Sequence, residues 1–181
     1  MSLLPFLMAW YLKENPGLLQ SRTNNGDLII PPLVTERTDL TGIDAFSEEN
    51  MKELKGRWVL VNVIAHADCN ETCKDALHKS KQLLLMMGKD LTRIRRLAVV
   101  FNPISNEQAN AWWRDDARLL KAKPNDELKS KLTALKSGPL PDGVLLLMDP
   151  FGNLMMQYEP GFDPYKVKSD LKKLLNISQI G

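Results

Sequence analysis

The clearest pattern in the chain is a run of apolar and β-branched residues from Trp58 to Ala65. Such a run is typical of a strand that is buried on both faces of an α/β sheet. Farther on, apolar and small residues recur at helical spacing up to Gly88, a residue type that commonly ends helices. These positions are Cys73, Ala76, Leu77, Ser80, Leu84 and Met87. The pattern predicts a buried strand, a connecting loop and a long helix.

A second apolar run, Leu97–Phe101, predicts a second buried strand. A right-handed crossover through the intervening helix would make the two strands parallel. Ser105 and Gln108 form a capping-box pattern, which predicts the start of another helix. We expect this helix to continue through Leu120 and to stop at Pro124.

The C-terminal third contains a short helix, a hairpin and a last helix. Leucines at helical spacing within residues 128–135 predict the short helix. Residues 144–158 contain two apolar runs around a turn at 149–152, which predicts a β-hairpin. Asp163 followed by Pro164 is a typical helix start, so we expect the final helix there.

The N-terminal region differs in character from the rest. Residues 3–12 are an apolar run of ten residues, whereas a membrane-spanning helix needs about 20. We interpret residues 1–14 as the remnant of a longer membrane anchor. The alternative is an amphipathic docking segment of the soluble fold. Residues 15–32 are rich in turn formers and predict a linker, which leaves residues 33–181 as the folded domain.

The chain has only two cysteines, Cys69 and Cys73, and they lie at the predicted strand-to-helix junction. Two residues four apart in one regular helix have Cβ atoms about 5–6 Å apart, whereas a disulfide needs about 3.8 Å. Bridging therefore requires Cys69 to lie in the loop before the helix. The start of a helix favours a thiolate, and we expect Cys69 to be the exposed cysteine. In the reduced state the pair offers two soft ligands for Cu(I).

Composition narrows the choice of function. The 181 residues fit one domain plus an extra segment, and the net charge of +2 gives no electrostatic case for nucleic-acid binding. A zinc site built from Cys and His alone would use both cysteines and both histidines, which argues against structural zinc. His66, three residues before Cys69, is a weak candidate for a metal ligand. The alternative is that His66 is simply a polar residue at the end of a strand.

Three motifs together resemble the Sco (SenC) family. They are residues 55–62 (KGRWVLVN), the Cys69-x-x-x-Cys73 pair and residues 147–152 (LMDPFG). The resemblance covers about residues 30–176. It implies a thioredoxin-like α/β fold with a central mixed sheet flanked by helices. It also implies a membrane tether and a role in copper delivery or thiol maintenance during cytochrome c oxidase assembly.

One feature of that family is missing. Its members bind copper through the two cysteines and a histidine that precedes the hairpin, and a gap-free alignment places Pro141 at that position. The cysteines therefore match the family pattern, whereas the third ligand does not. His66 is the only substitute that the sequence offers.

The leading hypothesis is a membrane-tethered, Sco-like thiol–disulfide oxidoreductase at the extracytoplasmic (periplasmic) face of the inner membrane. Its partner would be a protein with thiols or a copper site, such as a cytochrome c oxidase subunit. In this hypothesis Cys69 attacks and Cys73 resolves the mixed disulfide. The alternatives are a Cu(I) chaperone that uses Cys69 and Cys73, and a non-catalytic interaction module. No cofactor other than copper is indicated.

Overall fold

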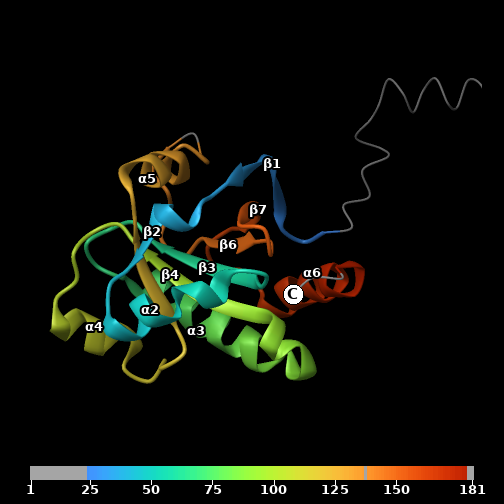
Figure 1. Ribbon diagram of the computed structural model, residues 1–181, viewed down its shortest axis with the longest axis horizontal. Helices are drawn as coiled ribbons and strands as arrows, with labels where there is room; N and C mark the ends of the chain where they lie inside the picture. Colours follow the sequence, from blue (N-terminus) through green and yellow to red (C-terminus); the bar gives the residue numbers. More distant parts are fainter. Residues whose placement is uncertain (1–23, 137, 179–181) are drawn as a thin grey trace, which may run out of the picture.

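The structure is a computed structural model that describes residues 24–136 and 138–178. These residues form a seven-stranded mixed sheet in the order β1-β7-β6-β3-β4-β5-β2, flanked by helices (Figure 1). The strands are β1 (Asp27–Val34), β2 (Leu40–Gly42), β3 (Trp58–Ile64), β4 (Ile94–Val100), β5 (Leu120–Pro124), β6 (Leu145–Met148) and β7 (Asn153–Tyr158). The helices are α2 (Ala45–Asn50), α3 (Glu71–Leu85), α4 (Asn106–Trp113), α5 (Asp126–Thr133) and α6 (Pro164–Ile177), with short 3₁₀ segments η2 (Arg37–Asp39), η3 (Met51–Leu54) and η4 (Gly88–Arg93). The predicted α/β architecture with a central mixed sheet is confirmed.

Strand β3 lies at the centre of the sheet and is buried along its whole length. It pairs in parallel with β4, from Trp58 beside Ile94 to Ile64 beside Val100. On its other side it pairs antiparallel with β6. The predicted strand–helix–strand unit is therefore correct, and it places the loop after Ile64 at one end of the sheet.

The two faces of the sheet carry separate cores. Val59, Val61 and Val63 of β3 pack on the face that is covered by α5. Trp58 and Leu60 point to the other face, which is covered by α3 and α6 (Figure 1). This alternation is the two-residue period of a strand, and it explains why β3 is apolar almost throughout.

The segment after α4 differs from the prediction. We expected one helix to reach Pro124, but α4 ends at Trp113 and residues 120–124 form strand β5. Leu120 and Ala122 of β5 are buried between β4 and β2. Pairing with these two strands decides the conformation, and it depends on residues distant in the sequence. The hairpin and the start of α6 are as predicted, with Asp163 capping α6.

The N-terminal edge of the sheet begins earlier than the expected domain boundary. Strand β1 starts at Asp27, inside the segment predicted as a linker, and pairs with β7. Asp170 of α6 is buried and holds the start of this strand, because its carboxylate accepts hydrogen bonds from the N–H groups of Asn25 (2.7 Å) and Gly26 (3.0 Å).

The predicted anchor, residues 1–14, lies outside the described residues. Within the described part of the chain, no helix is long and apolar enough to span a bilayer.

One arginine lies inside the domain. Arg96 of β4 is only 2% exposed. Its guanidinium donates to Asp116 Oδ2 at 2.6 Å, to the carbonyl oxygen of Leu77 at 2.8 Å and to Ser80 Oγ at 3.0 Å. Burial lowers the pKa of Arg96, while the neighbouring Asp116 carboxylate acts in the opposite direction. The side chain thereby fixes α3 to β4 and to the loop before β5.

Candidate functional site

Cys69 and Cys73 form a disulfide between β3 and α3, with 5.2 Å between their Cα atoms. Cys69 lies in the loop, and Asn70 is the N-cap residue of α3, which begins at Glu71. Asn70 Oδ1 accepts a hydrogen bond from the N–H of Cys73 at 3.0 Å. The expectation that Cys69 precedes the helix is therefore correct.

The disulfide is buried, and this overturns one expectation. Cys69 and Cys73 are each 3% exposed, so the prediction that Cys69 is the exposed cysteine is wrong. The pair packs into a cluster built from β3, α3, β4, α4 and the residue that precedes β5. Its other buried members are Ile64, Leu77, Ala98, Val100, Trp113 and Leu119. Trp113 and Leu119 come from a distant part of the chain, which is why the residues next to Cys69 do not reveal this cover.

Asp142 connects the cysteine loop to the segment that precedes β6. Its Oδ1 lies 2.7 Å from Nδ1 of His66, and its Oδ2 accepts a 2.6 Å hydrogen bond from Nδ2 of Asn70. Asn70 in turn caps the helix at Cys73. The chain of contacts from His66 through Asp142 and Asn70 to Cys73 spans both ends of the loop that carries Cys69.

Two further side chains hold the same loop. Gln108 of α4 donates from Nε2 to the carbonyl oxygen of Ala67 at 3.2 Å and to Asp68 Oδ1 at 3.1 Å. Asn102, after β4, donates to the carbonyl oxygen of Ala65 at 2.9 Å. The loop is thus fixed from three sides by polar groups.

Gly143 allows the close approach between the two loops. Its φ is +83°, and a Cβ atom there would lie 2.8 Å from the carbonyl oxygen of Thr72. A side chain at this position would be strained and would push the loop away from α3. The glycine therefore lets Asp142 reach Asn70.

The donor atoms near the disulfide suit a soft metal only after reduction. Within the described residues, no group of three or more His, Cys, Asp or Glu side chains is arranged to hold a metal ion. Reduction would release two thiolates, a pair that suits Cu(I). His66 binds Asp142 through Nδ1, which leaves Nε2 as its second nitrogen. Pro141, which the gap-free alignment places at the position of the Sco histidine, cannot act as a side-chain ligand.

A family model described as "Transmembrane-like, thioredoxin-like, C-terminal domain" matches residues 58–178. The match starts at the first residue of β3 and includes the disulfide, Asp142 and all of α6. The chain belongs to this family. No curated protein sequence matches it.

Solved structures confirm the thioredoxin-like fold and include Sco proteins. Apo Sco1 from Thermus thermophilus is similar over 86% of this chain and 99% of its own, with 14% identity and a TM-score of 0.57. Yeast Sco1 with copper bound is similar over 70% and 83%, with 15% identity and a TM-score of 0.53. A thiol:disulfide interchange protein from Bacteroides sp. is similar over 82% and 91%, with 14% identity and a TM-score of 0.53. The fold is thus shared by copper-binding and disulfide-exchanging proteins.

The sequence alone does not indicate that Asp142 and Gln108 lie near the cysteines. A signal for Asp142 was present in the predicted hairpin. If its first strand pairs antiparallel with β3, the residues just before that strand must lie beside the end of β3. The observed pairing of Asn62 with Leu145 places Asp142, which lies just before β6, beside the end of β3. The sequence pattern indicates Gln108 only as part of a helix cap, a role that it also has.

Proposed function

We propose that this protein carries out thiol–disulfide exchange with a protein partner through Cys69 and Cys73. The observation that carries the proposal is the disulfide that joins Cys69, in the loop, to Cys73, in the first turn of α3, because the start of a helix is a position that favours a thiolate after reduction. Both the family membership and the shared fold support this chemistry.

The exchange would proceed in two balanced steps. A thiolate of the partner attacks the Cys69 sulfur, the Cys69–Cys73 bond breaks, and Cys73 leaves as a thiolate. The second partner thiolate then attacks the mixed disulfide and releases Cys69. The partner loses two electrons and gains a disulfide, while this protein becomes a dithiol. In the reverse direction Cys69 attacks a partner disulfide and Cys73 resolves it.

Access to the sulfur atoms requires the loop to move. Both cysteines are buried, so a partner thiolate can reach Cys69 only if residues 66–70 shift outward. Asp142 and Gln108 each hold this loop by two polar contacts and Asn102 holds it by one, in addition to the apolar packing of Cys69. The polar contacts therefore control how often the disulfide is exposed.

The setting of the reaction is also part of the proposal. A disulfide persists in an oxidising, extracytoplasmic compartment. The apolar residues 3–12 and the family description agree with a tether to the membrane. As the partner we propose a protein with thiols or a copper site, such as a cytochrome c oxidase subunit.

Cu(I) transfer is the second candidate. The favouring observation is that the fold is shared with yeast Sco1, which was solved with copper bound. In this case reduction of the disulfide frees two thiolates, and copper is a cargo that passes to a partner by ligand exchange. A non-catalytic module with a structural disulfide is the third alternative.

One paired experiment separates the three. Free thiols are counted in the full chain across a graded glutathione buffer, and Cu(I) affinity is measured by competition on the reduced protein. Reversible two-electron behaviour with weak copper binding supports exchange, whereas tight one-to-one Cu(I) binding supports the chaperone. A pair that stays oxidised throughout, with no copper binding, indicates the module. As a further check, Cys73→Ser should trap a mixed disulfide on Cys69 more readily than Cys69→Ser does on Cys73.

A further inference from the structure

A groove of about 710 Å³ opens at the end of β3 opposite the disulfide. The loop after β1, the start of β2, the η3 segment and the β6–β7 turn line it. Lys55 lies on its wall just before β3, whereas Cys69 follows β3. The volume is within the range of about 300–1,000 Å³ that small-molecule sites occupy.

The floor of the groove is apolar and only partly covered. Leu40, Met51 and Leu54 are partly exposed side chains that pack against the core on the α5 face. Phe151, at the tip of the β6–β7 turn, is 75% exposed and forms one lip. Apolar side chains that line a concave surface and face solvent favour a ligand with its own apolar part.

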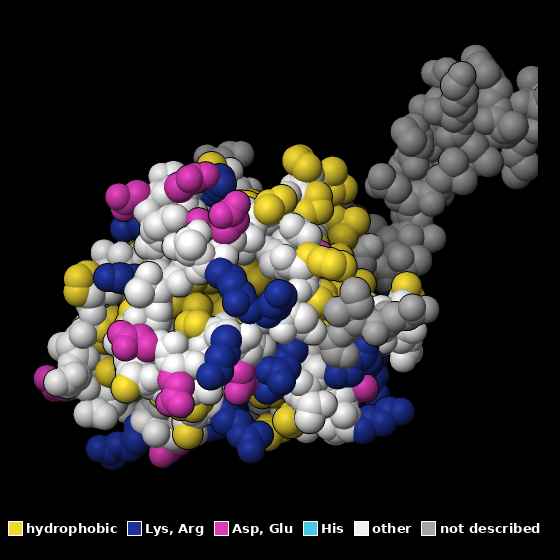
Figure 2. Space-filling view, viewed as in Figure 1, with side chains coloured by type: hydrophobic (Ala, Val, Ile, Leu, Met, Phe, Trp, Pro, Cys, Tyr) yellow, Lys and Arg dark blue, Asp and Glu magenta, His cyan; other side chains and the backbone are white. Residues whose placement is uncertain are grey.

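The rim is positively charged. Arg37, Lys52 and Lys55 line the groove, are exposed, and have no ion pair within the described part of the chain. Glu36 is the one acidic residue of the lining, and its backbone N–H donates to Asp39 Oδ2 at 2.7 Å in the cap of η2. Figure 2 shows this face, where hydrophobic surface lies between Lys and Arg side chains. The rim therefore attracts an anion.

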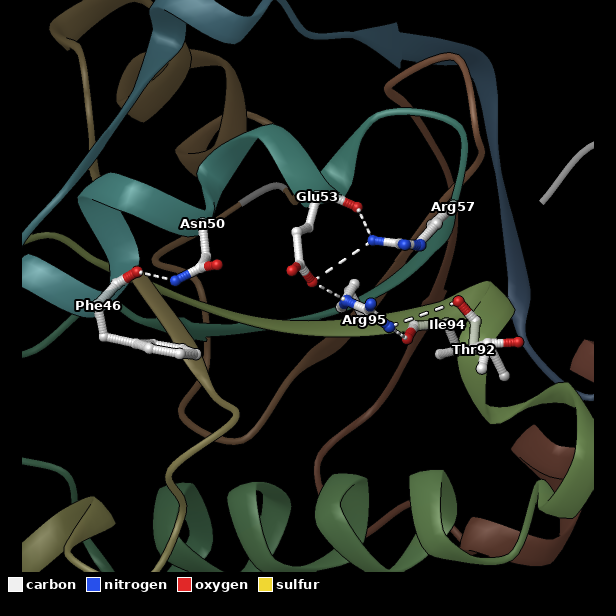
Figure 3. A network of polar contacts seen from close by, with 7 residues as sticks. All are labelled: Phe46, Asn50, Glu53, Arg57, Thr92, Ile94 and Arg95. Carbon is white, nitrogen blue, oxygen red and sulfur yellow. Dashed lines mark hydrogen bonds and ion pairs between the residues drawn. The ribbon is translucent and has the colours of Figure 1, made fainter.

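A neighbouring ion-pair network fixes the segment that carries Lys52 and Lys55 (Figure 3). Glu53, between them, accepts from Arg95 Nε at 2.6 Å and lies 3.4 Å from Arg57 Nη1. The hydrogen bond from Arg95 lowers the pKa of Glu53, so that carboxylate stays ionised and paired with the two arginines. Lys52 and Lys55 remain available to a ligand.

We propose that this groove binds a single-chain anionic amphiphile, a free fatty-acid-type carboxylate. Its hydrocarbon chain would lie on the apolar floor, and its carboxylate would lie among Arg37, Lys52 and Lys55. The proposal goes beyond disulfide exchange and does not depend on it.

The lining favours a hydrocarbon chain over a peptide. The floor side chains offer no strong hydrogen-bonding groups. Two carbonyl oxygens at the turn are already used, because Gly152 accepts from the N–H and hydroxyl of Thr35 and Pro150 accepts from the N–H of Gly56. A peptide would bury backbone polar groups there without partners, and this would cost free energy.

The test is calorimetric titration of the full chain with sodium dodecanoate below its micelle concentration. We expect saturable one-to-one binding that weakens about fourfold for each methylene removed from the ligand. Lys52→Glu/Lys55→Glu should weaken binding at least tenfold, and Phe151→Ser about fivefold. The matched control is Lys89→Glu/Lys172→Glu, which makes the same charge change on exposed lysines outside the groove and should change affinity less than twofold.

Three outcomes would overturn the proposal. The first is no saturable binding by the wild-type chain, and the second is equal weakening in the control variant, which would indicate non-specific attraction. The third is binding to phosphatidylglycerol vesicles or to an acidic amphipathic peptide without binding of monomeric dodecanoate. Circular dichroism of each variant confirms that it is folded, and Phe151→Ser supplies an independent test because this side chain is mostly exposed.

Discussion

Asp142 accepts a 2.6 Å hydrogen bond from Nδ2 of Asn70, the residue that lies between the two cysteines and caps α3. These two residues are 72 positions apart in the sequence. A single carboxylate before β6 therefore helps to keep the disulfide loop closed, and His66 binds its other oxygen.

Replacing Asp142 should loosen this loop. Asp142→Ala removes its contacts to Asn70 and His66, and each such bond contributes about 0.5–1.5 kcal/mol. We expect the second-order rate of disulfide reduction by dithiothreitol to rise about tenfold and the thermal midpoint to fall by several degrees. The control is Glu107→Ala, which removes an exposed carboxylate on α4. An unchanged rate in Asp142→Ala would show that Asp142 does not restrict access to the sulfur atoms.

Arg96 should be sensitive even to a conservative change. Lysine lacks the planar guanidinium group with which Arg96 donates hydrogen bonds to Asp116, Leu77 and Ser80 at the same time. We expect Arg96→Lys to lower the free energy of unfolding by about 2 kcal/mol, and Arg96→Ala by about 3–5 kcal/mol because it leaves Asp116 without its partner. Urea denaturation followed by tryptophan fluorescence measures both. A loss below about 0.5 kcal/mol for Arg96→Ala would contradict the assigned role.

The contact between Asp44 and Lys121 predicts a dependence on pH. Burial acts to raise the pKa of Asp44, but hydrogen bonds from Lys121 and Ser47 outweigh it, so the pKa lies below the ordinary value of 3.8. A lowered carboxylate pKa stabilises the fold above that ordinary value, and this stabilisation is lost as the pH falls through the folded-state pKa.

The test compares the wild-type chain with Asp44→Asn, which can retain the helix cap to Ser47. Because Asp44 is partly exposed, we expect the free energy of unfolding of Asp44→Asn at pH 7 to be lower than that of the wild type by only about 1 kcal/mol. Urea denaturation measures this deficit. The deficit should shrink as the pH is lowered below 3.8. Glu49→Gln, an exposed change on α2, should show no such trend. A loss of unfolding free energy that grows as the pH falls would contradict a lowered pKa of Asp44.

Asp170 should be important for the N-terminal edge of the sheet. Its carboxylate also accepts from the Tyr158 hydroxyl at 3.2 Å. Burial and then this carboxylate raise the pKa of Tyr158, which keeps the hydroxyl protonated as a donor. We expect Asp170→Ala to cost about 3 kcal/mol, which corresponds to a thermal midpoint lower by about 6–12 °C. It should also expose β1 to proteolysis. Deleting residues 1–14 should leave the midpoint nearly unchanged, which separates the two effects.

The central part of the fold was predictable because its signals are local. Trp58–Ala65 is apolar and β-branched, and Asp163-Pro164 is a helix start that needs no distant partner. Strand β5 was not predictable in this way, since Leu120 and Ala122 take an extended conformation only when β4 and β2 lie on either side. At the site, too, local features can be read from the sequence, whereas contacts between distant residues cannot. The pair Cys69 and Cys73 is visible in the sequence, whereas its cover by Trp113 depends on tertiary packing.

The hydrogen bonds from Asn25 and Gly26 to the Asp170 carboxylate determine how the domain would respond to a pulling force. Any pull transmitted along the chain toward β1 would first load hydrogen bonds to a buried carboxylate on α6. Strands β7 and β6 then lie between β1 and β3, which leads to the cysteine loop. Tension on the N-terminal side of β1 would thus be borne at the edge of the sheet, and the geometry around the disulfide would be insulated from it.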